Sequence, residues 1–477
     1  MSKLLNNYCK QESMDFRKYL LLQKDIKLFN ADSAEYLYYA PRGLIYKISD
    51  LHFKQYIDTC ISDNFKNSPL SPSLIKDIHS YFMDSVSRED TKHINIQTSD
   101  IDISAIVLNI SGSCNLNCRY CFARNKGKFA FKNMSVDVAV EAIDYMVNTS
   151  RAKDSFLISF FGGEPFLQNS TIEKTIQITE HRHPSKKFNY SVTTNGTVLT
   201  DKHIEIIKKH NISLLISLDG TEETTNRNRP FVKGKGNTFE TILHNSDILK
   251  QHGIPFDFRA TIVAGQDNIV DIVKFFESQK AGYHIVFCFP TYDGKHEYAE
   301  WNEKNIDILQ KQFNDMIEYY FEKIKNKEFI HAKFILEKLK IIASREVTNV
   351  SCGAGRNMIA VNADGTLYTC MNYSGIAKTS IGNLSQGINN ETNRNYMPED
   401  VDKTLCKNCN IRYLCAGACM SERYFCHEDT TKLVEQTCKL QKMAWHGYLV
   451  LFQKIKNLYP KLIDNIANHK LDYEKIY

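Results

Sequence analysis

Three cysteines in the first third of the chain have a spacing that suits a metal centre. Cys114, Cys118 and Cys121 form a Cys-x3-Cys-x2-Cys segment directly after the apolar run 105–110, which has the pattern of a buried strand. Thiolates bind zinc or an iron–sulfur cluster, and closed sites of either kind take four ligands. Three thiols therefore predict either a distant fourth ligand or a metal with one open position, where chemistry can take place.

This segment resembles the cluster motif of radical S-adenosylmethionine (SAM) enzymes. Its spacing, with Tyr120 and Phe122 beside the third cysteine, is more restrictive than a lone Cys-x2-Cys pair, although a zinc knuckle or a group of buried thiols is the alternative. In that family three cysteines hold a 4Fe–4S cluster, and its fourth iron binds the amino and carboxylate groups of SAM. The resemblance implies that Cys114, Cys118 and Cys121 are the metal ligands and the catalytic residues.

Composition narrows the class of protein. With 477 residues and 43% hydrophobic residues, the chain is expected to hold about three domains. The 60 basic and 55 acidic residues nearly balance, which argues against a nucleic-acid partner. The sequence has neither an apolar run of transmembrane length nor a signal peptide at its start, so we expect a cytoplasmic protein with no membrane association. Because that compartment keeps thiols reduced, the 14 cysteines indicate metal rather than disulfides.

Residues 1–100 are expected to form a small module of their own. The turn at 41–43 separates two strand-like runs and predicts a hairpin, and residues 50–64 and 72–88 have helical spacing. A winged-helix-like module fits this order, and an extension that packs on the next domain is the alternative. More weakly, the region resembles the leader-peptide recognition domains (RRE-like) of radical SAM peptide maturases. Such domains bind the leader of a precursor peptide as an added strand.

Strand and helix patterns then alternate from 101 to 345. Six strand-like runs, with helical segments between them, imply a parallel sheet with right-handed crossovers. A partial (β/α)6 barrel of the radical SAM type is therefore the expected α/β core, and the apolar-periodic run 304–343 is expected to supply its last helices. The expected strands cover 105–110, 156–161, 190–194, 214–218, 256–263 and 284–289.

Short motifs stand at the ends of these expected strands, where barrel enzymes carry their sites. They are Gly162-Gly163-Glu164-Pro165, Thr193-Thr194-Asn195-Gly196 and Ser217-Leu218-Asp219-Gly220. By resemblance, Gly162, Gly163 and Glu164 hold the amino group of SAM, and Ser217 contacts the cofactor together with Asn195. The alternative is that these residues have structural roles only, because tight turns need glycine and Ser217 or Asn195 also fit helix caps.

The resemblance also implies an arginine that binds the carboxylate of SAM. Arg229 occupies the matching position, with Arg227 as its near neighbour, and Arg259 on the fifth strand is a second candidate. Ion pairs with surface carboxylates are the alternative for these arginines. Cys288, on the sixth strand, has apolar neighbours and is expected to be an inert core thiol.

A second cysteine array follows residue 345. Its members are Cys352, Cys370, Cys406, Cys409, Cys415, Cys419, Cys426 and Cys438. The turn at 363–365 predicts a hairpin before Cys370, and four thiols within residues 406–419 form a segment too short for a core of its own, which needs metal. One or two structural zinc sites are the alternative.

The array resembles the SPASM domain of radical SAM peptide-modifying enzymes, in which two auxiliary 4Fe–4S clusters interleave. By this resemblance, the ligands of the distal cluster are Cys406, Cys409, Cys415 and Cys438. Those of the proximal cluster are Cys352, Cys370 and Cys419. The eighth position is then either an open iron, which we favour, or Cys426. This resemblance places the SPASM domain at 346–440, ahead of a C-terminal helix at 441–477.

Together these resemblances imply a radical SAM peptide maturase with SAM and three 4Fe–4S clusters. It would cleave SAM to a 5′-deoxyadenosyl radical, take its electron from a donor such as flavodoxin or ferredoxin, and crosslink a ribosomally made precursor peptide. Related sulfatase-modifying enzymes carry an aspartate base where this chain has Met371, which favours a cysteine thioether crosslink. The alternatives are a sulfatase-maturase-like protein oxidase, a carbon–carbon crosslinking maturase, and a zinc module without activity.

Overall fold

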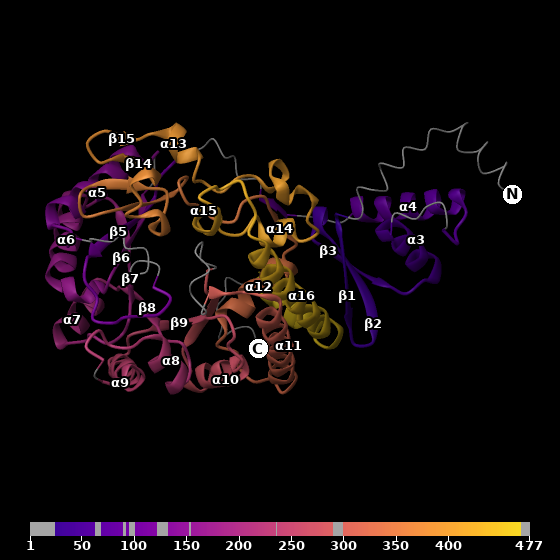
Figure 1. The fold of residues 1–477 in the computed structure, drawn as a ribbon, viewed down its shortest axis with the longest axis horizontal. Helices are drawn as coiled ribbons and strands as arrows, with labels where there is room; N and C mark the ends of the chain where they lie inside the picture. Colours follow the sequence, from indigo (N-terminus) through magenta and orange to yellow (C-terminus); the bar gives the residue numbers. More distant parts are fainter. Residues whose placement is uncertain are drawn as a thin grey trace.

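The structure is a computed structural model that describes residues 24–62, 68–88, 92–94, 101–121, 132–151, 154–234, 236–289 and 299–468. A small sheet with α3 and α4 lies at one end of the molecule, and a large sheet with its covering helices lies at the other (Figure 1). The long helix α16 (Glu435–Leu458) lies between them and contacts β1, α11 and α12. No helix in the described part of the chain is long and apolar enough to cross a membrane.

The N-terminal module is an antiparallel sheet with two helices. Its strands β1 (Ile26–Ala31), β2 (Ala34–Tyr39) and β3 (Leu44–Ile48) are ordered β1-β2-β3, followed by α3 (Leu51–Ser62) and α4 (Pro72–Ser87). The predicted hairpin is confirmed, with a 3-10 turn over Ala40–Arg42 and Gly43 at φ 61°. Leu37, Tyr56 and Ile57 are fully buried in a core that belongs to the module itself.

The barrel sheet is built from six parallel strands in sequence order. They are β5 (Ala105–Ser111), β6 (Ser155–Gly162), β7 (Lys187–Thr194), β8 (Ser213–Ser217), β9 (Phe256–Ile262) and β10 (Gly282–Phe287). All six expected strands are therefore present, and the α/β partial barrel is confirmed. Their apolar side chains are buried under helices that lie between them in sequence, so the carboxyl ends of all six strands meet at one edge.

The covering helices agree with the expected pattern except in one place. They are α5 (Val136–Thr149), α6 (Asn169–Arg182), α7 (Asp201–Lys209), α8 (Glu222–Asn228), α9 (Thr238–Gln251) and α10 (Ile269–Gln279). The short helix α8 was not expected, because its polar sequence lacks an apolar stripe. The run 304–343 divides into α11 (Glu303–Lys325) and α12 (Lys333–Ala343).

The cysteine-rich region continues the barrel sheet. β12 (Met358–Val361) pairs in parallel with β5, and the predicted hairpin to β13 (Thr366–Tyr368) is confirmed. The sheet then ends with β14 (Ser380–Asn383) and β15 (Gly387–Ile388). Since β5 leads to Cys114 and β13 leads to Cys370, one sheet positions both cysteine regions.

Two shorter elements complete the array. The short helix α14 (Arg412–Cys415) ends with Cys415, and Cys419 is the N-cap of α15 (Met420–His427). Cys406 lies in a 3-10 turn over Leu405–Asn408, which ends at Cys409. The C-terminal helix begins earlier than expected, at Glu435, so it includes Cys438, and α17 (Pro460–Asn468) follows it.

Candidate active site and second cysteine array

The loop after β5 gathers the first three cysteines. Burial raises the pKa of Cys118 to about 12, opposed by the charge of Arg229, and the neighbouring thiolates of Cys121 and Cys114 raise it further. The loop backbone is held by the segment that follows α8: Asn117 N donates to Pro230 O at 2.7 Å. The three thiols therefore lie close together in a fixed loop at the mouth of the barrel.

The two glycines after β6 are required by the packing of this loop. Gly163 N donates to Ser111 O at 2.8 Å, and a Cβ atom at Gly163 would lie 2.1 Å from Ser113 O. Gly162 has φ 118°, a backbone region that side chains rarely adopt. The Gly162-Gly163 motif, which is expected to approach SAM, thus also packs against the backbone of the cysteine loop.

Glu164 lies in the interior of the protein. Its side chain is 0% exposed, and its carboxylate accepts hydrogen bonds from Thr194 Oγ1 at 2.7 Å, Asn195 N at 2.7 Å and Phe166 N at 3.0 Å. Burial raises its pKa to about 7, against these three hydrogen bonds. Glu164 thus ties the ends of β6 and β7 together. Its expected contact with the amino group of SAM stays a prediction.

Asn195 connects β7 to the cysteine loop. Its Nδ2 donates to Asn115 Oδ1 at 2.8 Å and lies 3.7 Å from Cys114 Sγ, while its Oδ1 accepts from Thr197 N at 2.9 Å. The helix-cap alternative does not hold, because the N-cap of α7 is Thr200.

The structure separates the two candidate arginines. Arg227 is exposed on α8 and lies 3.9 Å from Glu223, whereas Arg229 is 6% exposed and lies over the ring of Tyr120 at 5.2 Å. Arg229 Nη2 donates to Asp219 Oδ1 at 3.0 Å, and its Nη1 lies 3.9 Å from Cys118 Sγ. Of the two, Arg229 is the one beside the cysteine loop.

Asp219 and Tyr120 complete this network, and their part in it was not expected from the sequence. The Tyr120 hydroxyl donates to Asp219 Oδ2 at 2.5 Å, and Thr261 N donates to Asp219 Oδ1 at 3.1 Å. Among the described residues, the buried Nε of Arg229 has no hydrogen-bond partner. The guanidinium is therefore fixed on one side by Asp219 and keeps a free donor, which suits an anionic ligand.

Two further predicted residues lie at the neighbouring strand ends. Ser217, at the end of β8, is paired in register with Arg259 on β9. Burial lowers the pKa of Arg259, and the charge of Arg229 lowers it further. Two guanidinium groups near each other make this mouth favourable for a carboxylate.

Cys288 follows β10 and is buried with Val263 and Ala299. Burial raises its pKa to about 12, so its thiol stays protonated and unreactive, as expected for a core thiol.

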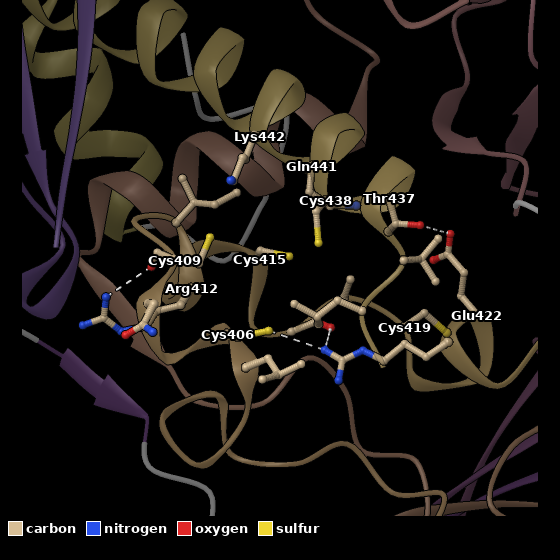
Figure 2. Close-up of a pocket in the computed structure, with 18 residues that line it drawn as sticks. Cys406, Cys409, Arg412, Cys415, Cys419, Glu422, Thr437, Cys438, Gln441 and Lys442 are labelled. Carbon is tan, nitrogen blue, oxygen red and sulfur yellow. Dashed lines mark hydrogen bonds between the residues drawn. The ribbon is translucent and has the colours of Figure 1, made fainter. Parts of the chain in front are cut away.

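The distal thiol group, which we define as Cys406, Cys409, Cys415 and Cys438, lines one cavity of about 230 Å³ (Figure 2). Burial raises the pKa of Cys415 to about 12, and the thiolates of Cys409, Cys406 and Cys438 raise it further. Cys438 reaches the other three from α16, across the cavity (Figure 2).

The proximal thiol group is formed by Cys352, Cys370 and Cys419. Burial raises the pKa of Cys370 to about 12, and the neighbouring thiolates of Cys419 and Cys352 contribute. Cys419 Sγ also lies 3.0 Å from Ser421 Oγ. Cys426 lies on α15, seven positions after Cys419.

The spacing of the thiols distinguishes two kinds of metal site. Within the described ranges, no three His, Cys, Asp or Glu side chains are close enough to share a single metal ion. A zinc ion at about 2.3 Å from each sulfur draws its thiolates to about 4 Å from one another. An iron–sulfur cluster binds each thiolate through a different iron, which requires a wider group around a larger space. The distal thiol group surrounds such a space, so its residues fit an iron–sulfur cluster.

The chain resembles known proteins both in sequence and in fold. Residues 108–278 match the radical SAM superfamily. The sequence is 24% identical over 385 residues to a cysteine-type anaerobic sulfatase-maturating enzyme of Clostridium perfringens, covering 77% of this chain and 99% of that one. It is 22% identical over 408 residues to the radical SAM cyclopropyl synthase TigE of Paramaledivibacter caminithermalis, covering 80% and 81%. An uncharacterised protein of Methanocaldococcus jannaschii is 35% identical over 170 residues, which are 36% of this chain and 56% of that relative.

Solved structures share the fold. The anaerobic sulfatase-maturating enzyme anSMEcpe with bound AdoMet superimposes with a TM-score of 0.65 at 20% identity, covering 77% of this chain and 98% of that one. Streptococcus suis SuiB bound to its precursor peptide SuiA superimposes with a TM-score of 0.50 at 13% identity, covering 86% and 98%. The similarity therefore extends well beyond residues 108–278.

Proposed function

We propose that this chain, which is an enzyme of the radical SAM superfamily and a maturase, crosslinks a ribosomally made precursor peptide through a cysteine thioether. The observation that carries the proposal is that one sheet positions two groups of cysteines. Its strand β5 leads to the three thiols at the barrel mouth, and the neighbouring strands β12 and β13 lead to the second thiol array. A separate N-terminal module lies next to that array.

The residues of the barrel mouth have distinct tasks in this proposal. Cys114, Cys118 and Cys121 would hold a 4Fe–4S cluster, which when bound supplies the electron that cleaves SAM to a 5′-deoxyadenosyl radical. Arg229 would bind the carboxylate of SAM, because its guanidinium is buried and keeps an unpartnered donor. Asn195 and the Gly162–Gly163 turn would orient the cluster loop, and Ser217 and Arg259 would border the cofactor on the next two strands.

The second array would hold two auxiliary 4Fe–4S clusters. The distal thiol group offers four ligands, whereas the proximal thiol group offers three, so we propose that one proximal iron is left for the thiolate of the substrate. Met371, which follows Cys370, has no proton-accepting atom. A substrate cysteine bound through its sulfur suits such a position. Its thiol would lose a proton on binding and the 5′-deoxyadenosyl radical would take a hydrogen atom from the target carbon, so the C–S bond would form as one electron passes to the auxiliary site.

The N-terminal module would bind the leader of the precursor. In the described residues, β3 pairs with β2 alone, so its other edge presents backbone donors and acceptors. An added peptide strand satisfies those groups by backbone hydrogen bonds. The proposed domain limits are 1–100 for this module, 101–345 for the barrel and 346–440 for the SPASM domain, whose last cysteine lies on α16. A flavodoxin or ferredoxin would supply the electron.

A protein oxidase of the sulfatase-maturating kind is the second candidate. It is favoured by the sequence match, which spans 99% of a sulfatase-maturating enzyme. A carbon–carbon crosslink of the precursor is a third possible outcome of the same radical chemistry.

The test is anaerobic reconstitution with iron and sulfide, followed by incubation with SAM, dithionite and the short cysteine-bearing peptide encoded nearest to this gene. A thioether crosslink removes two hydrogen atoms from the peptide and blocks its thiol. An aldehyde product that reacts with a hydrazide would instead support the oxidase, and loss of two hydrogens with a free thiol would support a carbon–carbon crosslink. Zinc without acid-labile sulfide in the purified protein would overturn the proposal altogether. Cys118→Ala is the control that should yield no 5′-deoxyadenosine.

Leader binding has a separate test in hydrogen exchange of the whole enzyme. The leader should slow exchange of the amides of β3 (Leu44–Ile48) and leave those of β15 (Gly387–Ile388) unchanged. Protection elsewhere with none at β3 would contradict the proposed edge.

A further inference from the structure

The cavity of the distal thiol group is lined by cations as well as by thiols. Arg423, on α15, is 4% exposed and donates from Nη2 to Gly417 O at 2.7 Å. The same Nη2 lies 3.5 Å from Cys406 Sγ, the contact drawn as a dashed line at Cys406 in Figure 2. This distance is that of a charged N–H···S hydrogen bond, so Arg423 places a full positive charge on one ligand position.

Lys442 lies one helical turn further along α16 than Cys438 and also lines the cavity. Figure 2 shows the Lys442 side chain on the helix that carries Cys438, at the border of the cavity. Burial, Cys406 and Cys409 raise the pKa of Cys438, while Lys442 and Arg423 act against this rise. Cys438 therefore lies in the field of two positive charges.

The other two thiols have cations from distant parts of the chain. Lys27, on β1 of the N-terminal module, has its pKa lowered by burial and by Lys442, and the thiolate of Cys409 acts in the opposite direction. Lys338, on α12, has its pKa lowered by burial, against the charges of Glu337 and the Cys415 thiolate. The backbone of β1 is fixed against this region, because Asn410 Nδ2 donates to Ile26 O at 3.0 Å.

The proximal thiol group has a different environment. The pKa of Cys419 is raised by burial, lowered by hydrogen bonds from Ser421 and from the Glu422 backbone, and raised by the Glu422 carboxylate. Arg356 is directed at the backbone there, since its Nη2 donates to Cys352 O at 2.8 Å. The charge of Arg356 also acts on the Cys352 thiolate, and Glu422 also lines the distal cavity. Among the contacts of the described residues, the two groups therefore differ in the guanidinium contact with a ligand sulfur, which Arg423 makes at Cys406.

We infer that Arg423, together with Lys442, makes the distal site the more easily reduced of the two auxiliary sites. The inference rests on the proposed function in one respect, namely that both thiol groups hold iron–sulfur clusters. A cluster bound by four thiolates is an anion, and reduction adds another negative charge. Nearby cations and N–H···S bonds stabilise the more negative state more strongly, which raises the reduction potential. Arg423 is a positioning residue here, since it acts through the Cys406 sulfur.

The test is a redox titration of the reconstituted holoenzyme followed by EPR, with the distal signal assigned as the one that Cys438→Ser perturbs. Arg423→Gln should lower the midpoint potential of that signal enough to change its reduced-to-oxidised ratio at fixed poise at least tenfold, about 59 mV for one electron. Arg423→Lys, which keeps the charge, should recover most of the shift. Lys442→Gln should lower the same potential by less.

Lys439→Gln is the matched control. Lys439 lies on the same helix and forms an ion pair with Glu435 at 3.1 Å and another with Glu303, and its replacement should leave all potentials unchanged. A normal distal potential in Arg423→Gln at full iron content would overturn the inference, as would a distal potential below the proximal one in the unmodified enzyme. If Arg423→Gln does not fold, Lys442→Gln decides by the same criterion. Protein that binds zinc without sulfide would refute the proposed function instead.

Discussion

Asp25, in the N-terminal module, accepts a hydrogen bond from Arg412, which lies between Cys409 and Cys415 in the distal thiol group. The distance from Arg412 Nη2 to Asp25 Oδ1 is 2.5 Å, and the two side chains are 5% and 12% exposed. Arg412 Nη1 also donates to Lys24 O at 3.1 Å. The N-terminal module and the cysteine-rich region are thus joined directly beside the predicted distal cluster.

Asp25→Ala should loosen this junction. The variant leaves the Arg412 guanidinium buried with Asp402, at 3.3 Å, as its remaining acid, so we expect the free energy of unfolding to fall by about 2 kcal/mol. Hydrogen exchange should become faster in β1, and thermal unfolding should begin at a lower temperature. Asp58→Ala, on the exposed face of α3, is the control and should change neither measurement.

Gly163→Ala should be strongly destabilising. The new Cβ would meet Ser113 O at 2.1 Å, and a backbone carbonyl that fixes the cysteine loop cannot move away without displacing Cys114. We expect a loss of about 3 kcal/mol of stability and no 5′-deoxyadenosine. Gly253→Ala has open space around its Cβ and should cost only the strain of its φ of 66°, about 1 kcal/mol. Equal effects of the two variants in thermal unfolding would contradict this reading of the motif.

Tyr120→Phe should weaken SAM binding without unfolding the protein. The variant removes one of the three donors to Asp219 and leaves Arg229 less well fixed over the ring. A lost hydrogen bond to a charged group is worth about 1.5 to 3 kcal/mol, so we expect the Kd for SAM to rise about tenfold or more. Calorimetric titration measures this Kd. Tyr145→Phe is the control, because it removes a hydroxyl contact to Ile388 N at 3.2 Å that is not part of this network.

The buried carboxyl group of Glu164 should make the free energy of unfolding depend on pH. Because burial raises its pKa from 4.5 to about 7, the folded state keeps a proton that the unfolded state releases. Stability from this group is therefore present below about pH 4.5 and is lost as the pH rises to about 7, a loss of about 3 kcal/mol. Denaturant unfolding of the protein and of Glu164→Gln between pH 5 and pH 8 measures the difference. A difference between the two that stays constant with pH would contradict a pKa of about 7 for Glu164.

Iron content should distinguish the cysteines of the distal and proximal thiol groups from Cys288, which belongs to neither. Cys370→Ala and Cys415→Ala each remove a thiol from a group and should lower the iron bound per chain, whereas Cys288→Ala should retain it. Cys288 is the suitable control because it is also buried, with a pKa likewise raised to about 12. Iron and sulfide analysis after anaerobic reconstitution checks all three.

Local patterns in the sequence were sufficient for much of the fold. The alternation of apolar strands and amphipathic helices predicted all six barrel strands, because period and turn residues act over a few positions. The short spacings Cys114-x3-Cys118-x2-Cys121 and Cys406-x2-Cys409 likewise require their thiols to be neighbours, whatever the rest of the chain does. The helix α8, which lacks such a pattern, was missed.

Tertiary structure alone decided which distant residues meet. Arg227 and Arg229 are two positions apart in the sequence, but only packing against the cysteine loop buries Arg229 against Asp219 while Arg227 faces solvent. Glu164 became a buried link between two strands for the same reason. The sequence established that the chain carries enough thiols in metal-binding patterns. The docking of α16 brings Cys438 to the distal cavity, and the docking of the N-terminal module brings Asp25 to Arg412. Contacts between remote segments depend on how whole elements pack and not on local spacing.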